Sequence, residues 1–399
     1  MSTIRQGVAP VYDVPQQIKY DAGGRMRVSQ ITTLGDYRCI GFDKSLLLDN
    51  VGTGSGAFSN NKYTLSVTTG KYFIRQSHRY HPYFSGKSQL VECTFDKFHK
   101  EAGITKRIGY FSSSQNAPYT DNLDGFFLEN DGSDYYIKCY RDGVETVSIP
   151  SQGWDGLETF HDYDWSFFTV VIFEFLWLGG AVLRIWIKGK TGFDVLHTVH
   201  YAGTSENTFI KSPHQPVRYE LRSSSGGGSL RYICAQVGTE GSIEESGSSR
   251  SVKTGSTAIT LAAIGTSYPV ISIQKQSAYR DIPVMFDHIS ILVASANDRL
   301  LWELQINPTL SAPLTYGAVS NSAINFAVGD GIITVSGAGT SICGGYLVQG
   351  QDVDHSIFKN NFFAWLGSTP ANVMDQFVLV CTPLTGNIAT FATMDYKEY

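Results

Sequence analysis

Residues 126–149 read FFLENDGSDYYIKCYRDGVETVSI, and this stretch decides the fold class. Three short runs rich in aromatic and β-branched residues are separated by Asn130-Asp131-Gly132 and by Arg141-Asp142-Gly143. Asp-Gly pairs between such runs favour tight hairpin turns, because Gly adopts positive φ without steric strain. The pattern therefore predicts a three-stranded β-meander.

The residues that follow continue in the same way. Residues 168–178, 181–187 and 193–201 are apolar, β-branched or aromatic, and Gly-containing turns separate them. Residues 216–222 alternate apolar with polar, and residues 230–237 are their expected partner strand. No segment up to residue 240 shows the apolar period of a three-turn helix. We therefore expect one all-β sandwich over residues 41–241.

The composition changes after this sandwich. Residues 242–262 begin with a small, polar, apolar-poor stretch that is typical of a linker. Beyond it, further strand patterns predict a smaller C-terminal β-sandwich over residues 263–399. The strands are expected at residues 269–273, 284–294, 300–306, 331–335 and 376–381. Residues 1–40, with several Pro and Gly, are expected to form an extended N-terminal arm containing a strand or two.

Composition and charge bound the partners. The chain has 399 residues, a net charge of −5 and no basic stretch, which argues against nucleic acid as a partner. The N-terminus lacks the apolar core of a signal peptide, and the longest apolar run, residues 167–178, is too short for a membrane span. Synthesis in a cytosol without membrane insertion is expected. The six cysteines have no metal-binding spacing and are expected to be buried free thiols, although spacing alone leaves disulfides open.

Gly86-Lys87-Ser88 ends like a phosphate-binding loop. Such a loop needs a Gly five residues before Gly86, where His81 stands, and Pro82 has no N–H to donate to a phosphate. Residues 89–95 then alternate polar and apolar as a strand does. The preferred interpretation is a turn at Gly86 that leads into a strand, with Lys87 and Ser88 on its solvated edge.

No residues are assigned to a metal site or to any other cofactor site. His78 and His81, like His197 and His200, are three residues apart, so on a strand they face opposite sides and cannot hold one metal ion together. A loop-bound calcium ion is the one cofactor left open, at residues 121–125 or 130–134. The preferred interpretation of these acidic loops is that Asp and Asn accept hydrogen bonds from their own turns.

Catalysis is not predicted either, and no catalytic residue is assigned. Acid–base hydrolysis of a glycoside needs two carboxylates that converge on a cleft. Glu174 lies in an aromatic strand between Phe173 and Phe175, but the sequence places no second carboxylate beside it. Glu174 could act as an acid if it faced a groove; otherwise it points to solvent or into a subunit contact.

One aromatic–basic group looks like an exposed contact surface. Residues of this kind are frequent interface anchors, but they can equally cover the end of a sandwich. The candidate interface residues are Arg75, Arg79, Tyr80, His81, Tyr83 and Phe84.

Several blocks of the chain resemble a widespread family of virion structural proteins of tailed phages. The blocks are residues 74–90, 105–111, 124–129, 175–180, 216–222, 231–234 and 301–308. At the level of the fold, the meander followed by a long aromatic strand, a tight turn and a return strand is similar to concanavalin-A-like sandwiches. This similarity implies a lectin-like jelly roll in the first half of the chain.

The resemblance implies a non-enzymatic virion protein, such as a tail or neck fibre, an appendage, or a head-decoration component. The implied partners are further copies of the chain, with a trimer as first choice, other virion proteins, and as a candidate a glycan of the host surface. The alternatives are a virion-borne glycan-binding module, or a polysaccharide hydrolase that uses Glu174 and a loop aspartate.

Overall fold

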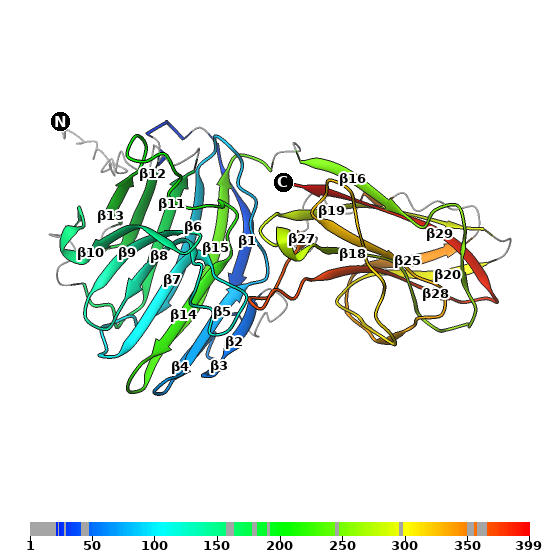
Figure 1. The fold of residues 1–399 in the computed structure, drawn as a ribbon, viewed down its shortest axis with the longest axis horizontal. Coiled ribbons are helices and arrows are strands. Elements are labelled where there is room, and N and C mark those ends of the chain that lie inside the picture. The colour runs from blue at the N-terminus through cyan, green and yellow to red at the C-terminus, as the bar shows by residue number, and fades with distance from the viewer. Residues whose placement is uncertain are drawn as a thin grey trace, which may run out of the picture.

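The computed structural model describes residues 21–22, 24–27, 29–40, 48–156, 163–177, 182–189, 192–243, 247–294, 298–348, 355–356 and 365–399. It shows two β-sandwiches that lie side by side along the longest axis of the molecule (Figure 1). Within these ranges the helices are two 3-10 turns, η2 (Ser151–Gly153) and η3 (Ser277–Tyr279). No helix of the described ranges is long and apolar enough to cross a membrane.

The first sandwich is formed by an eight-stranded and a seven-stranded antiparallel sheet. The larger sheet has the order β13 (Phe193–His200), β12 (Val182–Lys188), β11 (Thr169–Leu176), β6 (Gln89–Asp96), β15 (Gly228–Glu240), β4 (Lys62–Val67) and β3 (Ser55–Ser59), with β1 (Ile31–Arg38) also paired to β15. The smaller sheet has the order β10 (Val144–Pro150), β9 (Tyr135–Arg141), β8 (Asp124–Asn130), β7 (Ile104–Ser112), β14 (Val217–Ser223), β5 (Tyr72–Ser77) and β2 (Leu48–Gly52).

Aromatic rings join these two sheets. Phe126 of β8 packs against Phe173 and Phe175 of β11, with ring centroids 5.5 and 5.0 Å away. Because side chains alternate along a strand, Phe126 and Leu128 face this core whereas Phe127 and Glu129 face outward. The period-two pattern of the sequence therefore decides which face of each strand is buried.

The second sandwich has its own hydrophobic core between two six-stranded sheets. One sheet contains β16 (Ser248–Lys253), β29 (Ile388–Glu398), β19 (Val284–Val293) and β26 (His355–Ser356), with β17 (Ile259–Leu261) on β29 and β27 (Trp365–Leu366) on β19. The other has the order β22 (Gly317–Ala318), β23 (Ile324–Val328), β18 (Tyr268–Lys275), β28 (Gln376–Pro383), β20 (Arg299–Ile306) and β25 (Thr340–Val348). A two-stranded ribbon, β21 (Thr309–Leu310) with β24 (Val335–Gly337), completes the domain.

The predicted fold class, an all-β sandwich followed by a smaller one, is confirmed. The meander is present as β8, β9 and β10, and Gly132 and Gly143 in its turns adopt φ of 93° and 85°. The turn predicted at residues 179–180 lies outside the described residues. All six cysteines are free thiols, and four of them are buried.

The strand predicted at residues 331–335 is wrong for most of its length, since β24 begins only at Val335. Gly331 adopts φ of 75°, and the side chain of Asp330 accepts hydrogen bonds from the N–H groups of Ile332 and Ile333. Those N–H groups are thereby used in a local turn rather than in a ladder between strands.

The predicted domain boundaries also shift. β1 pairs with β15, so residues 31–38 belong to the first sandwich, while residues 1–20 of the predicted arm lie outside the described residues. The predicted linker, residues 242–262, contains β16 and β17, which both pair with β29 of the second sandwich. β16 lies at the edge of its sheet and is largely exposed, so it needs few apolar residues and resembles a linker in composition.

Replacing Phe126 by Ala is expected to lower the free energy of unfolding by about 3–5 kcal/mol, because it leaves a cavity between the two sheets. Chemical denaturation measures this change. Val144→Ala is the matched control, since Val144 is 65% exposed on the edge strand β10 and should change stability by less than about 0.5 kcal/mol. Equal stability of the two variants would contradict the proposed core.

Candidate functional site

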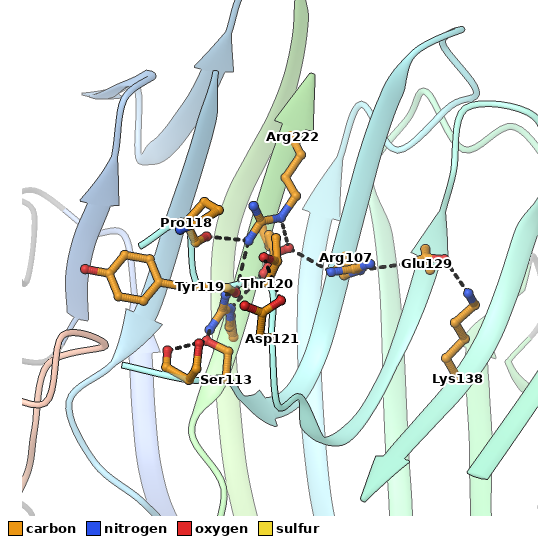
Figure 2. A network of polar contacts seen from close by, with 12 residues as sticks. Arg107, Ser113, Pro118, Tyr119, Thr120, Asp121, Glu129, Lys138 and Arg222 are labelled. Atoms are coloured by element: carbon orange, nitrogen blue, oxygen red, sulfur yellow. Dashed lines mark hydrogen bonds and ion pairs between the residues drawn. The ribbon is translucent and has the colours of Figure 1, made fainter. Parts of the chain in front are cut away.

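A row of charged side chains crosses the outer face of the seven-stranded sheet (Figure 2). Glu220 of β14 accepts hydrogen bonds from Arg218 at 2.9 and 2.6 Å and from Arg107 of β7 at 3.0 Å. Arg107 also donates to Glu129 of β8 at 2.5 Å, and Lys138 of β9 lies 2.9 Å from the other oxygen of Glu129. The row therefore alternates in charge along four neighbouring strands.

Glu220 is the centre of this row, because Arg222 also donates to it. Burial alone raises the pKa of a carboxyl group, but the positive charges of Arg218, Arg222 and Arg107 outweigh burial here and lower the pKa of Glu220 to about 2. The side chains of Arg218 and Glu220 are both fully buried. The carboxylate is therefore held ionised without contact with bulk water.

The two arginines of β14 also hold a loop over the sheet. Arg218 donates to the hydroxyl of Ser113 at 2.7 Å and to the carbonyl of Tyr119 at 3.1 Å. Arg222 donates to the carbonyls of Pro118 at 2.8 Å and Tyr119 at 3.1 Å. The loop between β7 and β8 is thus fixed by charge-assisted hydrogen bonds, which are stronger than neutral ones.

The sequence carried a partial signal of this network. Arg218, Glu220 and Arg222 alternate with apolar residues in β14, so their position on one face could be expected from period two alone. Arg107 could not be identified as their partner, since it lies 113 residues away from Glu220 in the chain. The sequence therefore did not reveal that these four side chains form one charged network.

The fixed loop forms one wall of a polar cavity of about 390 Å³ between the two sandwiches. The lining residues come from four segments and, apart from Ala278, all of them are polar. They are Ser112, Ser113, Ser114, Gln115, Asn116, Asn122, Asp124, Asp142, Lys211, Ser212, Gln215, Ser277, Ala278, Arg280 and Asp281.

Of the five charged residues that line this cavity, all but Asp281 have side chains that form an ion pair or hydrogen bonds with described residues of the chain, as follows. Lys211 forms an ion pair of 3.0 Å with Asp142, and Arg280 donates to the carbonyl of Ser113 across the two domains. Asp124 accepts hydrogen bonds from the backbone N–H groups of Lys211 and Ser212 and from the amide of Gln215, at 2.7, 3.0 and 2.6 Å. The cavity therefore offers mainly hydroxyl and amide groups to a ligand.

The two acidic loops considered for calcium differ in what their carboxylates bind. Asp131 accepts hydrogen bonds from the N–H groups of Ser133 and Asp134, both at 2.8 Å, and Asp124 binds the residues just named. Among the described residues no group of three or more His, Cys, Asp or Glu side chains could hold a metal ion. Asp131 fits the turn interpretation, whereas for Asp124 that interpretation is wrong, because its carboxylate binds residues 211–215 of a distant loop.

Glu174 does not face a groove. It is fully buried on the outer face of the eight-stranded sheet, where it forms an ion pair with Arg27 of the N-terminal segment. The indole N–H of Trp186 donates to Glu174 at 3.0 Å and the hydroxyl of Ser88 donates at 3.2 Å. Ser88 is therefore buried, and its expected place on a solvated edge is wrong. β6 begins at Gln89, however, and Gly86 before it adopts φ of 83°, as expected for a turn.

The six candidate interface residues are buried within the single chain, so the expectation that they look exposed is wrong. The ring of Tyr80 lies 5.2 Å from the ammonium group of Lys275, and the ring of Phe84 packs on Tyr399 with centroids 5.9 Å apart. Lys275 and Tyr399 both belong to the second sandwich. The surface that these side chains would offer to a neighbouring subunit is thus covered by the chain's own second domain.

The other four candidate residues support the same region from inside. Three of them contact residues of the first sandwich, and Arg79 is attracted by a carboxylate of the second. His81 binds the hydroxyl of Tyr37 at 2.7 Å, Tyr83 stacks on Phe175 with centroids 5.6 Å apart, Arg75 lies 3.8 Å above the ring of Tyr63, and buried Arg79 is attracted by Asp375. The group is a support for the domain junction rather than a free face.

His78 is a further junction residue. Its ring lies 3.3 Å from a carboxylate oxygen of Asp49 in the first sandwich and 3.6 Å from one of Asp375 in the second. Neither ring nitrogen makes a hydrogen bond of normal geometry, so the attraction is mainly that of charge. Burial alone lowers the pKa of a histidine, but the two aspartates outweigh burial and raise the pKa of His78 to about 10. His78 is therefore a positive charge between two negative ones at neutral pH.

Comparisons with known proteins show likenesses of structure but not of sequence. No protein-family model and no curated protein matches the chain. A β-glucanase of Bacillus licheniformis is 12% identical, with a TM-score of 0.33, and the match covers 51% of this chain and 96% of the glucanase.

Two further solved structures show similar values. A legume lectin-like domain from Entamoeba histolytica is 13% identical with a TM-score of 0.34, over 52% of this chain and 98% of that domain. A carbohydrate esterase of the Shiga toxin-encoding bacteriophage phi24B is 13% identical with a TM-score of 0.33, over 53% of this chain and 100% of the esterase.

Glu220→Gln is expected to lower the free energy of unfolding by about 3–5 kcal/mol at neutral pH, because it leaves Arg218 and Arg107 buried without their shared charge partner. Since the pKa of Glu220 is lowered in the folded state, its stabilisation is present above about pH 4.5 and is lost as the pH falls towards 2. The difference in free energy of unfolding between wild type and variant should therefore become smaller as the pH falls. Exposed Glu206→Gln is the control, and a variant as stable as that control would contradict the network's role.

His78 predicts a loss of stability in alkali. Because its folded pKa is raised, its contribution is complete below about pH 6.5 and is lost as the pH rises towards 10. We expect wild type to lose more of its free energy of unfolding than His78→Gln does between these limits, because deprotonation removes the charge attraction to Asp49 and Asp375. Denaturation at a series of pH values measures the difference, with exposed His200→Gln as control. Parallel curves for wild type and His78→Gln would refute the prediction.

Proposed function

We propose that this protein is a non-enzymatic structural component of a tailed-phage particle, and that it binds a neutral glycan in the polar cavity between its two sandwiches. The observation that carries the binding part is the lining of that cavity. The virion part rests on the sequence blocks described above, such as residues 74–90 and 216–222.

The chemistry of the lining favours a ligand rich in hydroxyl groups. Ser, Asn and Gln side chains both donate and accept hydrogen bonds, as sugar hydroxyls do. Because Lys211 is paired with Asp142 and Arg280 already binds a carbonyl, the cavity has no free cluster of one charge to attract an ion. A neutral glycan therefore fits this site better than a phosphate or a metal ion does.

Binding without turnover fits the arrangement of carboxylates. Glycoside hydrolysis needs one carboxylic acid and one carboxylate on either side of the scissile bond. Glu174 is buried under Arg27, Glu220 is surrounded by three arginines, and Asp124 is saturated by backbone and amide donors. Asp142, which also lines the cavity, is paired with Lys211, so the lining offers Asp281 no second unpaired carboxylate for hydrolysis.

On the particle, we propose a symmetric homo-oligomer, with a trimer as first choice by analogy with phage appendages. The positions in question are a tail or neck fibre, an appendage or a head decoration. Electron cryomicroscopy of intact particles tests this part, together with the mass of the purified protein in solution. Absence of the chain from purified particles would overturn it.

The double variant Gln115→Ala, Asn116→Ala tests the binding site, because both residues are exposed in the cavity wall. We expect binding to an array of bacterial surface polysaccharides to weaken about tenfold, as the loss of one or two hydrogen bonds would give. Gln152→Ala, which changes an exposed residue outside the cavity, should bind as wild type does.

Two outcomes would contradict the proposal. Wild-type protein that binds no polysaccharide of the array, or a double variant that binds equally well, would remove the cavity as a glycan site. Shortening of a bound polysaccharide during incubation, abolished by Glu174→Gln, would instead support the hydrolase alternative.

A further inference from the structure

One short segment of the second sandwich separates the junction cavity from a second cavity of about 670 Å³. This segment contains η3 and the residues on either side of it. Ser277 and Arg280 face the junction cavity, whereas Tyr279 and Ile282 line the second one. The two cavities therefore share a wall that is only a few residues thick.

The shared wall is tied to both domains. The side chain of Gln276 donates to the carbonyls of Ser322 and Ile324 at 2.8 and 3.2 Å, which fixes its start to the second sandwich. At its end, Arg280 donates to the carbonyl of Ser113 in the first sandwich, and buried Lys275 donates to the carbonyl of Arg280. The relative position of the two cavities is thus set by hydrogen bonds.

The second cavity differs from the first in having an exposed aromatic ring. Tyr279 is 47% exposed, and Ile282 and Val319 extend the apolar side of the cavity. The opposite side is polar and ordered: Glu398 accepts hydrogen bonds from the hydroxyl of Ser322 and from the N–H of Ala323 at 2.8 Å. An apolar ring beside polar groups suits a ligand with one apolar and one polar face, as a sugar ring has.

We infer that the two cavities are subsites for one glycan chain, which passes over the η3 wall from the polar junction cavity to the ring of Tyr279. The inference rests on the proposed function and specifies its ligand as a neutral polysaccharide rather than a single sugar. Tyr279 and Arg280 are neighbours in sequence, with Cα atoms about 3.8 Å apart. Because Arg280 lines the first cavity and Tyr279 lines the second, the two linings come within one residue of each other along the chain.

Dependence of affinity on ligand length tests this inference. A polysaccharide that wild type binds on the array is partially hydrolysed, sized into fractions from monosaccharides upward, and titrated calorimetrically. We expect affinity to rise with length until both cavities are filled. Tyr279→Ala should weaken binding of the long fractions about 2- to 12-fold, which corresponds to the loss of one aromatic contact, and should leave the shortest binding fraction unchanged. Tyr279→Phe keeps the ring and should bind as wild type does.

The double variant Gln115→Ala, Asn116→Ala separates this inference from the proposed function, because it should weaken short and long fractions alike. If the double variant weakens binding but Tyr279→Ala binds every fraction as wild type does, the second subsite is refuted and the glycan site remains. If affinity does not rise with length, the extended ligand is refuted in the same way. If wild type binds no polysaccharide, both the glycan site of the junction cavity and the second subsite are refuted. Tyr279 is half-exposed, so unfolding of its variant is not expected, and circular dichroism checks this.

Discussion

The carboxylate of Glu220 remains ionised where water does not reach it, and this constraint shapes one whole face of the first sandwich. A buried charge is very costly unless other groups neutralise and hydrogen-bond it, and Arg107, Arg218 and Arg222 do so. Their remaining N–H groups then need acceptors, which Ser113 and the carbonyls of residues 118 and 119 supply. The position of the loop, and with it one wall of the junction cavity, follows from these requirements.

The domain junction follows a similar logic with different groups. Residues 78–84 follow β5, and their side chains contact the second sandwich. Tyr80 lies against Lys275, His78 against Asp375 and Phe84 against Tyr399. The close approach of Gly367 reinforces the contact, since a Cβ atom there would lie 2.5 Å from the carbonyl oxygen of His78. The two sandwiches thus share an interface in which ionic, aromatic and backbone contacts all take part, and the junction cavity lies beside it.

Local patterns predicted local structure well. The Asp-Gly turns of residues 130–143 and the alternation in β14 depend on a few neighbouring residues, so both could be recognised without a structure. The errors concern residues whose state depends on distant segments. Ser88 is buried because the N-terminal segment covers Glu174, and β16 is a strand because β29 is available to pair with it.

The sequence by itself determined the all-β class, the order of most strands and which face of each strand is apolar. These follow from periodicity and turn chemistry, which act over a few residues. Only the tertiary structure decided that residues 75–84 are internal, that Arg107 meets Glu220, and that two cavities share the wall around η3. Each of these depends on segments far apart in the chain, whose contacts are set by packing and sheet register rather than by local propensity.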